Sequence, residues 1–178
     1  MSRSQELQDE LRAVRRRYDE LRRGDTAALR RCKTAAEIAL EPVYWRLVPS
    51  PAQQPREFTH VALLFPLAKQ AGSARGAFSF GRFLRRRLGK GGNEGDRGSL
   101  RFRRLLASSD RDELDHRLRG VLRLACADGA GVDWGVLGTD ILWFFAESDN
   151  VRRRWAQDFY APMPVTSESG PEVASSQP

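Results

Sequence analysis

The chain of 178 residues holds 30 Lys and Arg against 23 Asp and Glu, which gives a formal net charge of +7. This length suits one compact domain or two small ones. The longest apolar runs are far too short to span a bilayer, and the charged N-terminus is not a signal peptide. Cys32 and Cys126 lie far apart and suggest neither a disulfide framework nor a zinc ligand set. We therefore expect a cytoplasmic protein with no membrane segment and two buried free thiols.

The N-terminal stretch predicts a long helix followed by a short one. Between residues 5 and 23 the apolar residues recur at spacings of four and three, which places them on one helical face. Gly24 is expected to end this helix. Asp25 is expected to cap the short second helix.

Two further helix starts follow. Thr34 and Glu37 have the spacing of a capping box, which predicts a short helix after Thr34. Pro42 predicts another start, because proline is favoured in the first turn of a helix. We expect the aromatic pair of this helix, Tyr44 and Trp45, to face the core.

The middle of the chain alternates between loops and helices. Three prolines within residues 49–55 predict a loop, and a helix is expected over residues 56–71, interrupted and kinked by Pro66. After a second loop, residues 80–88 (FGRFLRRRL) predict a short amphipathic helix with its apolar side inward and its arginines outward. Residues 89–98 include five glycines, so we expect a flexible loop there.

Helices resume in the C-terminal half. Residues 99–107 (SLRFRRLLA) predict one helix, and Asp110 with Glu113 forms a capping box for the next. Asp133 is expected to cap a helix that is apolar nearly all round and therefore buried. Ser148 is expected to cap a last helix that carries three arginines.

The fold class follows from these elements. No segment shows the period-two alternation of a strand, so the sequence predicts an all-α protein, a helical bundle of two lobes with no sheet. We expect residues 1–72 to form an N-terminal lobe and residues 73–160 a C-terminal lobe. Residues 161–178, rich in Pro, Ser and Gly, predict a disordered tail.

The residues offer no plausible set of reacting groups. His60 and His116 each lie alone on a predicted helix, in no metal-binding motif. No phosphate-binding loop motif occurs, and the adjacent carboxylates Asp112 and Glu113 belong to a first helical turn, where the helix dipole explains them. We therefore expect no enzyme, no cofactor and no metal site.

Arginine is the residue type that points to a function, because its planar fork matches phosphate oxygens. In the first helix the arginines alternate with acidic residues that can pair with them. Between residues 82 and 104, nine cations stand against Glu94 and Asp96 alone. Because nine like charges repel one another without a polyanion, this window predicts binding to nucleic-acid phosphates. Reading of bases is not predicted, since the helices display arginine almost alone and the four tryptophans are expected in the core.

Six segments carry a family resemblance: GDTAALRRC, VYWRLV, SFGRFLRRRL, RFRRLLASSDRDELDHRLRGVL, VDWGVLGTDILWF and VRRRWAQDFY. In this order they resemble the small subunit of the type I-E CRISPR Cascade complex, the CasB family. The resemblance runs from about Leu11 to Tyr160. It departs where Phe80 replaces an expected leucine and Gly120 an expected arginine.

The resemblance implies a non-catalytic, all-helical subunit of two lobes. It implies two copies packed head to tail along the inner face of the complex, beside the large subunit and the backbone subunits. Family members hold the duplex of crRNA and target DNA and guide the displaced DNA strand. The R-loop then stays open for the recruited helicase-nuclease.

The candidate nucleic-acid-binding residues come from two sources. The family motifs imply Arg30, Arg31, Arg82 and Arg119. The charge pattern adds Arg85, Arg86, Arg101, Arg103 and Arg104, and Arg123 lies one turn beyond the Arg119 motif. Arg46 matches a motif but also fits a structural role, and residues 152–154 contact either nucleic acid or a neighbouring subunit.

Two other functions fit the same residues. A free-standing DNA-binding regulator would prefer one duplex sequence and form a two-fold dimer. A basic scaffold protein would dock an acidic partner and show no affinity for nucleic acid at modest salt.

Overall fold

The computed structural model describes residues 3–48, 58–67, 79–89, 93–127, 129–146 and 150–161, without the side chains of residues 93–96. Within these ranges every regular element is a helix, and the predicted all-α class is confirmed. The elements are α1 (Arg3–Asp19), α2 (Arg23–Arg31), α3 (Ala35–Leu40), α4 (Pro42–Leu47), α5 (Phe58–Ala62), η1 (Phe65–Leu67), α6 (Phe80–Leu88), α7 (Asn93–Leu106), α8 (Arg111–Ala125), α9 (Trp134–Trp143) and α10 (Val151–Tyr160). None of these helices is long and apolar enough to cross a membrane.

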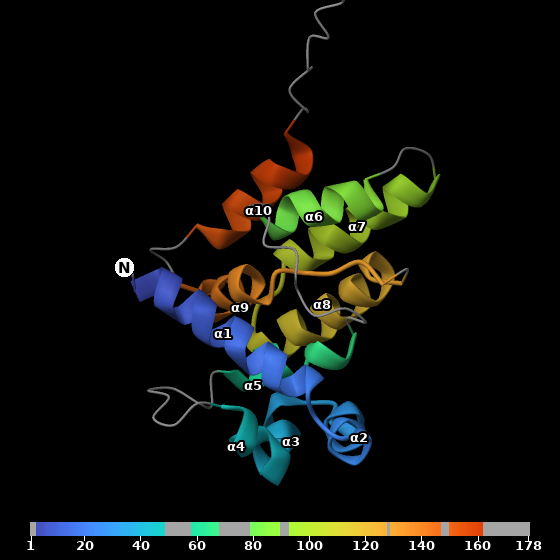
Figure 1. Ribbon diagram of the computed structural model, residues 1–178. Coiled ribbons are helices and arrows are strands. Elements are labelled where there is room, and N and C mark those ends of the chain that lie inside the picture. The colour runs from blue at the N-terminus through green and yellow to red at the C-terminus, as the bar shows by residue number, and fades with distance from the viewer. Residues whose placement is uncertain are drawn as a thin grey trace, which may run out of the picture.

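The helices are arranged in three levels from top to bottom in Figure 1. The helices α6, α7 and α10 lie together at the top, α1, α8 and α9 lie in the middle, and α2, α3 and α4 lie at the bottom. Helices far apart in the sequence pack together, as α1 does with α9 and α6 with α10. The N-terminal helix is therefore held by a helix from the last third of the described chain.

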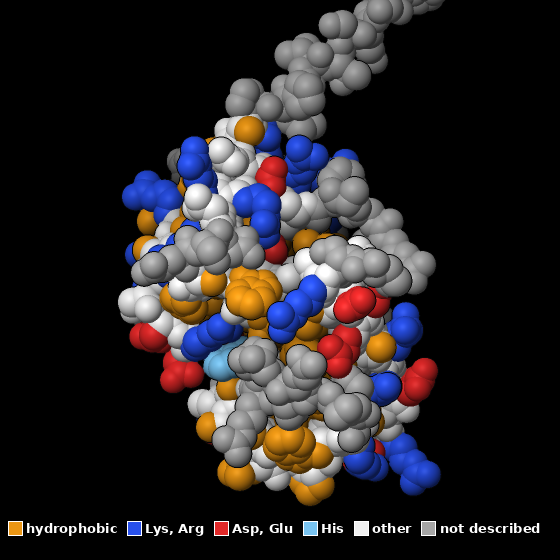
Figure 2. Space-filling model, turned by 90° about the vertical axis from the view of Figure 1, so that its left-hand side faces the viewer, with side chains coloured by type: hydrophobic (Ala, Val, Ile, Leu, Met, Phe, Trp, Pro, Cys, Tyr) orange, Lys and Arg blue, Asp and Glu red, His pale blue; other side chains and the backbone are white. Residues whose placement is uncertain are grey.

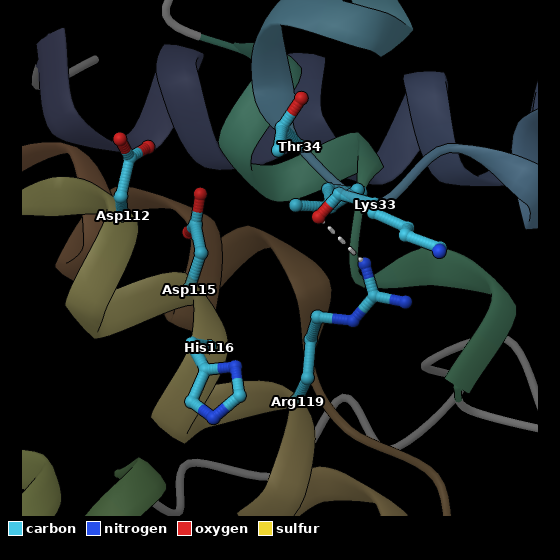
Figure 3. A pocket seen from close by; sticks show the side chains of 7 residues that line it. Lys33, Thr34, Asp112, Asp115, His116 and Arg119 are labelled. Carbon is cyan, nitrogen blue, oxygen red and sulfur yellow. Dashed lines mark hydrogen bonds between the residues drawn. The ribbon is translucent and has the colours of Figure 1, made fainter.

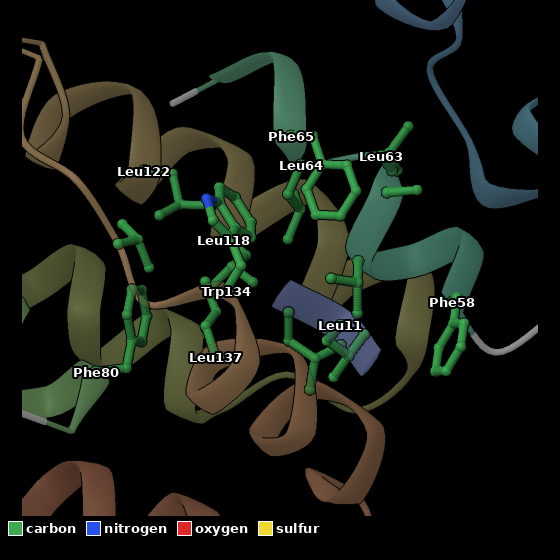
Figure 4. Close-up of a cluster of buried hydrophobic side chains, with 14 of the residues drawn as sticks. Leu11, Phe58, Leu63, Leu64, Phe65, Phe80, Leu118, Leu122, Trp134 and Leu137 are labelled. Atoms are coloured by element: carbon green, nitrogen blue, oxygen red, sulfur yellow. The ribbon is translucent and has the colours of Figure 1, made fainter. Parts of the chain in front are cut away.

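Two glycines of α9 allow its close contact with α1. A Cβ atom on Gly135 would lie 2.6 Å from a backbone oxygen of α1, and one on Gly138 would lie 2.7 Å from the Leu11 side chain. Any larger residue would push the two helices apart. The close contact places Leu11 in one buried core with Trp134 and Phe65 (Figure 4).

Three predicted helix starts are confirmed by side-chain hydrogen bonds. Thr34 Oγ1 accepts a bond from the Glu37 N–H at 3.2 Å, and Asp110 Oδ1 accepts one from the Glu113 N–H at 2.8 Å. Each of these glutamates in turn accepts a bond from the backbone N–H just before the cap, one residue earlier than in the usual capping box. Asp133 caps α9 by accepting bonds from two N–H groups of its first turn.

The boundary between the first two helices differs from the prediction. The first helix ends at Asp19 and α2 begins at Arg23, so Gly24 lies inside α2. Asp25 lies in the first turn of α2 rather than at its cap. The dipole of α2 favours a negative charge there, and the Asp25 carboxylate also pairs with Arg46 at 2.9 Å.

The helix predicted over residues 56–71 is interrupted before Pro66, as expected, and residues 56 and 57 lie outside the described ranges. The α-helix α5 ends at Ala62, and Phe65–Leu67 form a 3-10 turn. Pro66 has no N–H to donate to the Ala62 carbonyl, and its ring would clash there, so the α-helix does not continue through it. Residues 68–71 lie outside the described ranges.

The loop predicted over residues 89–98 is interrupted, because α7 already begins at Asn93. Gly98 lies inside this helix, where its lack of a side chain permits a close contact. A Cβ atom on Gly98 would lie 2.6 Å from the carbonyl oxygen of Leu88, at the end of α6. This glycine serves a close contact between two helices, a role that a count of glycines does not distinguish from a loop.

Two of the four tryptophans are not in the core, contrary to the prediction. Trp134 and Trp155 are at most 1% exposed, but Trp45 and Trp143 are each 46% exposed. Tyr44 is fully buried, as predicted. Successive helical positions point about 100° apart, so burying Tyr44 against the core leaves Trp45 largely in solvent.

The remaining predictions concern the two cysteines, the division into lobes, the cap at Ser148 and the C-terminal tail. Cys32 and Cys126 are buried thiols that are not joined in a disulfide bond, as expected. The lobe boundary at residue 72 and the cap at Ser148 lie outside the described residues, as does the tail beyond Ala161. The two-lobe division therefore stays a prediction.

Candidate nucleic-acid interface

The ten predicted arginines form two groups. The α2–α8 group lies where the C-terminus of α2 meets α8 and comprises Arg30, Arg31, Arg119 and Arg123. The α6–α7 group comprises Arg82, Arg85, Arg86, Arg101, Arg103 and Arg104. Figure 1 shows α2 at the bottom and α6 and α7 at the top, with α8 in the level between them. The structure therefore distributes these residues along the molecule instead of gathering them at one point.

Figure 2 shows one face of this distribution. Lys and Arg side chains gather over the upper part, at the level of α6, α7 and α10. Hydrophobic side chains are exposed at the lower end, at the level of α3 and α4. Leu40, at the end of α3, is 82% exposed. The upper level is the more cationic part of this face.

Many arginines donate hydrogen bonds to carbonyl oxygens at the C-termini of other helices. Carbonyls at helix C-termini lack the full set of intrahelical partners, and a cation there also offsets the negative end of the helix dipole. The donors are Arg17 at α4, Arg85 at α10, Arg87 at α8, Arg111 at α9, Arg117 at α7 and Arg119 at α2. Helix capping by arginine was not predicted, and it accounts for part of the arginine excess.

Three predicted arginines have structural partners. Arg119 Nη1 lies 3.2 Å from the Lys33 carbonyl oxygen and 3.4 Å from that of Cys32. Arg85 donates to the backbone at the end of α10, and Arg82 Nε lies 3.5 Å from an Asp158 carboxylate oxygen. These contacts orient the guanidinium groups and leave some of their N–H donors for another partner.

Five predicted arginines are exposed and have no hydrogen-bond or ion-pair partner in the part of the chain that the structure describes. They are Arg31, Arg101, Arg103, Arg104 and Arg123. On α7, the spacing of four and three places Arg101 and Arg104 on one stripe with the exposed Arg97. Arg30 is exposed but lies near the Tyr18 phenol, whose pKa burial raises and the Arg30 cation partly lowers.

A pocket of about 510 Å³ adjoins the α2–α8 group, and we call it the α8 pocket. Its lining residues are Lys33, Thr34, Leu63, Asp112, Asp115, His116 and Arg119. The four from α8 follow one another at spacings of three, one and three, so they share one helical face. Figure 3 shows the two carboxylates on one side of the pocket and Lys33 and Arg119 on the other.

Asp115 is the most buried polar group of the α8 pocket, at 4% exposure. Its Oδ2 atom lies 2.5 Å from His60 Nδ1, which connects α8 to α5. Its Oδ1 atom has no hydrogen-bond partner among the described residues. Burial raises the pKa of the Asp115 carboxyl, and the contact with His60 partly opposes that rise. His60 is thus bonded to a carboxylate, although the sequence predicted it to be isolated.

The sequence did not single out the α8 pocket. Its signal was present, because Asp112, Asp115, His116 and Arg119 repeat at helical spacing. Lys33 and Thr34 come from a distant segment, so only the fold brings them to α8. Within the described ranges, no group of three or more His, Cys, Asp or Glu side chains is arranged to hold a metal ion.

Comparisons with known proteins agree with this architecture. A sequence model of CRISPR-associated protein Cse2 matches residues 25–160. No curated protein matches the chain.

Two solved structures have a similar fold. The crystal structure of CasB from Thermobifida fusca is 18% identical, with a TM-score of 0.60, over 89% of this chain and 97% of that one. The crystal structure of a CRISPR-associated protein of the Cse2 family from Thermus thermophilus is 23% identical, with a TM-score of 0.63, over 91% of this chain and 100% of that one.

Proposed function

Since the chain belongs to the CRISPR-associated Cse2 family, the small subunit of type I-E Cascade, we propose that its exposed arginines hold nucleic-acid phosphates in that complex. The strands are those of the crRNA–target DNA duplex and the displaced DNA. The subunit performs no catalysis. By holding these strands it keeps the R-loop open for a helicase-nuclease recruited to the complex in the cytoplasm.

The observation that carries the proposal is the division of the arginines into two kinds. One kind caps helices and stabilises the fold, as Arg111 and Arg117 do. The other kind is exposed, and Arg101 and Arg104 have no partner among the described residues. Unpartnered cations on one helix repel each other, so a polyanion that covers them relieves the repulsion.

Backbone contacts of this kind are enough for the proposed role. The RNA–DNA duplex that forms in an R-loop is about as stable as the DNA duplex that it replaces. A modest number of phosphate contacts therefore shifts the balance. Because arginine predominates among the exposed cations of α7, the contacts follow the backbone and depend strongly on salt.

The proposed assembly follows the family. Two copies lie head to tail beside the large subunit and the backbone subunits, each divided into two lobes near residue 72. The α2–α8 group and the α6–α7 group then give each copy phosphate contacts at two levels of the molecule.

The proposal is tested by the salt dependence of binding. The Arg101→Ala/Arg104→Ala double variant should bind labelled single-stranded DNA and RNA–DNA duplex more weakly than the wild-type chain. For single strands, the slope of log affinity against log salt concentration should fall by about 0.7 for each phosphate that the variant no longer neutralises. Fluorescence anisotropy at four or five salt concentrations measures both quantities.

The matched control is Arg16→Ala/Arg23→Ala. It removes two exposed arginines outside both groups and changes the net charge equally. An equal loss in both double variants would show a general charge effect and contradict the role of α7. Absence of binding at low salt would favour the basic scaffold, and preference for one duplex sequence would favour the regulator.

A further inference from the structure

We propose that the α8 pocket takes one nucleotide of an unpaired strand, with its phosphate beside Lys33 and Arg119 and an amino-bearing base beside Asp112 and Asp115. The inference rests on the proposed function and deepens it. It assigns a preference among bases to one position, whereas the remaining contacts follow the backbone.

The size and the charge of the α8 pocket suit a ligand with two different ends. Its volume of about 510 Å³ lies within the usual range for small-molecule sites, roughly 300–1,000 Å³. Its carboxylates and its cations lie on opposite sides (Figure 3). A nucleotide has a matching polarity, because its phosphate is anionic and the amino group of its base donates hydrogen bonds.

The basic side of the pocket continues the α2–α8 group. Lys33 follows Arg31 by two residues, and the Arg119 guanidinium bonds to the Lys33 carbonyl oxygen at 3.2 Å. That bond holds Arg119 in place before any ligand arrives, so phosphate binding costs little side-chain ordering. A strand that contacts Arg31 therefore passes the mouth of the pocket.

The acidic side of the pocket calls for a hydrogen-bond donor. Ionised carboxylates only accept hydrogen bonds. Asp115 is 4% exposed, and its Oδ1 has no partner among the described residues, a costly condition for a buried polar atom. Figure 3 shows the Asp115 carboxylate directed toward the space between Asp112 and Thr34. A donor entering beside the exposed Asp112 approaches this carboxylate.

Base chemistry narrows the ligand. Cytosine, adenine and guanine carry an exocyclic amino group with two N–H donors, whereas an unpaired thymine has only its ring N3–H, between two carbonyl oxygens. A base within a duplex uses its amino group for pairing, so only an unpaired base can donate it fully. The exposed His116 ring supplies surface for the face of the base. The ligand is therefore a nucleotide of a single strand.

The test compares two pyrimidines that differ in this amino group. Fluorescence anisotropy should show the full chain binding a labelled 20-residue oligo(dC) about threefold to tenfold more tightly than oligo(dT), the effect of roughly one hydrogen bond. Asp112→Ala should abolish that ratio. Lys33→Ala should weaken both oligonucleotides and preserve the ratio.

A matched control is Glu6→Ala, because Glu6 is likewise an exposed acidic residue in a first helical turn. It changes the net charge as Asp112→Ala does and should leave the ratio unchanged. Equal affinity of the wild-type chain for both oligonucleotides, or an unchanged ratio in Asp112→Ala, would overturn the pocket and leave backbone binding intact. Binding to neither oligonucleotide would overturn the proposed function, and the pocket with it.

Discussion

Arg111 and Arg101 show how differently one residue type serves this molecule. The Arg111 guanidinium donates to the carbonyl oxygens of Ile141 and Leu142 at 2.8 and 2.7 Å, at the end of α9. The Arg101 side chain is exposed on α7 and has no partner among the described residues. Replacing either arginine with alanine lowers the net charge by one. A difference between the two variants therefore reflects the different roles of the two side chains.

Arg111→Ala should lower the free energy of unfolding by about 1.5–3 kcal/mol, because charge-assisted bonds to two helix-terminal carbonyls are removed. Its affinity for single-stranded DNA should change little. Arg101→Ala should instead weaken the affinity for single-stranded DNA and change the free energy of unfolding little. Urea denaturation measures the first quantity and anisotropy the second, and a loss of affinity without a loss of stability in Arg111→Ala would contradict the division.

The sequence predicted an excess of arginine but not its division. The partner of Arg111 is a backbone carbonyl thirty residues away, and no local spacing reveals such a contact. The same holds for Asp115 and His60, which meet only because α5 packs beside α8. The exposed arginines, in contrast, could be predicted, since the unbalanced charge of residues 82–104 is visible in the sequence itself.

At the scale of elements, glycines set how closely helices pack. A Cβ atom on Gly81 would overlap the Trp155 carbonyl oxygen and lie 2.9 Å from Asp158 Cβ, so α6 and α10 meet at this glycine. Gly120 lies inside α8, where a Cβ atom would meet nothing within 4 Å. Packing of α6 against α10 therefore requires a glycine at position 81, in the SFGR segment. At position 120, no packing contact with the described residues requires a glycine.

Opposite effects are expected from the same substitution at these two glycines. Gly81→Ala should lower the free energy of unfolding by about 1–3 kcal/mol, because backbone atoms of α10 must move. Gly120→Ala should raise it by about 0.5–1 kcal/mol, since alanine stabilises a helix interior relative to glycine. Thermal or urea denaturation checks both, and destabilisation by Gly120→Ala would contradict the open space found beside that residue.

Two helix caps formed by local bonds were predicted correctly, whereas several features that depend on packing were not. The caps at Thr34 and Asp110 depend on residues three positions apart, so the sequence shows them directly. The close contact of Gly98 with Leu88 depends on how α6 and α7 pack, and the exposure of Trp45 depends on which face of α4 is covered. Contacts of this kind appear only when the helices are assembled.

At the scale of the whole molecule, helices that lie far apart in the sequence pack against one another. The first helix packs on α9, and α6 packs on α10, so the described chain shares one buried core. The helix α8 carries two arginines of the α2–α8 group and contacts α7, which carries three of the α6–α7 group. The molecule thus presents the arginines that we propose to bind phosphates on two levels of one framework, which suits a strand running along it.

The lifetime of the R-loop in an assembled type I-E Cascade is the most direct test of whether the exposed arginines hold nucleic-acid phosphates. The complex is prepared with crRNA and either the wild-type chain or an Arg31→Ala/Arg101→Ala/Arg104→Ala variant, which removes residues from both groups. We expect equal incorporation of the two chains and faster R-loop dissociation with the variant, by a margin that shrinks as salt rises. Equal R-loop lifetimes at low salt, with the variant fully incorporated, would contradict this role of the arginines.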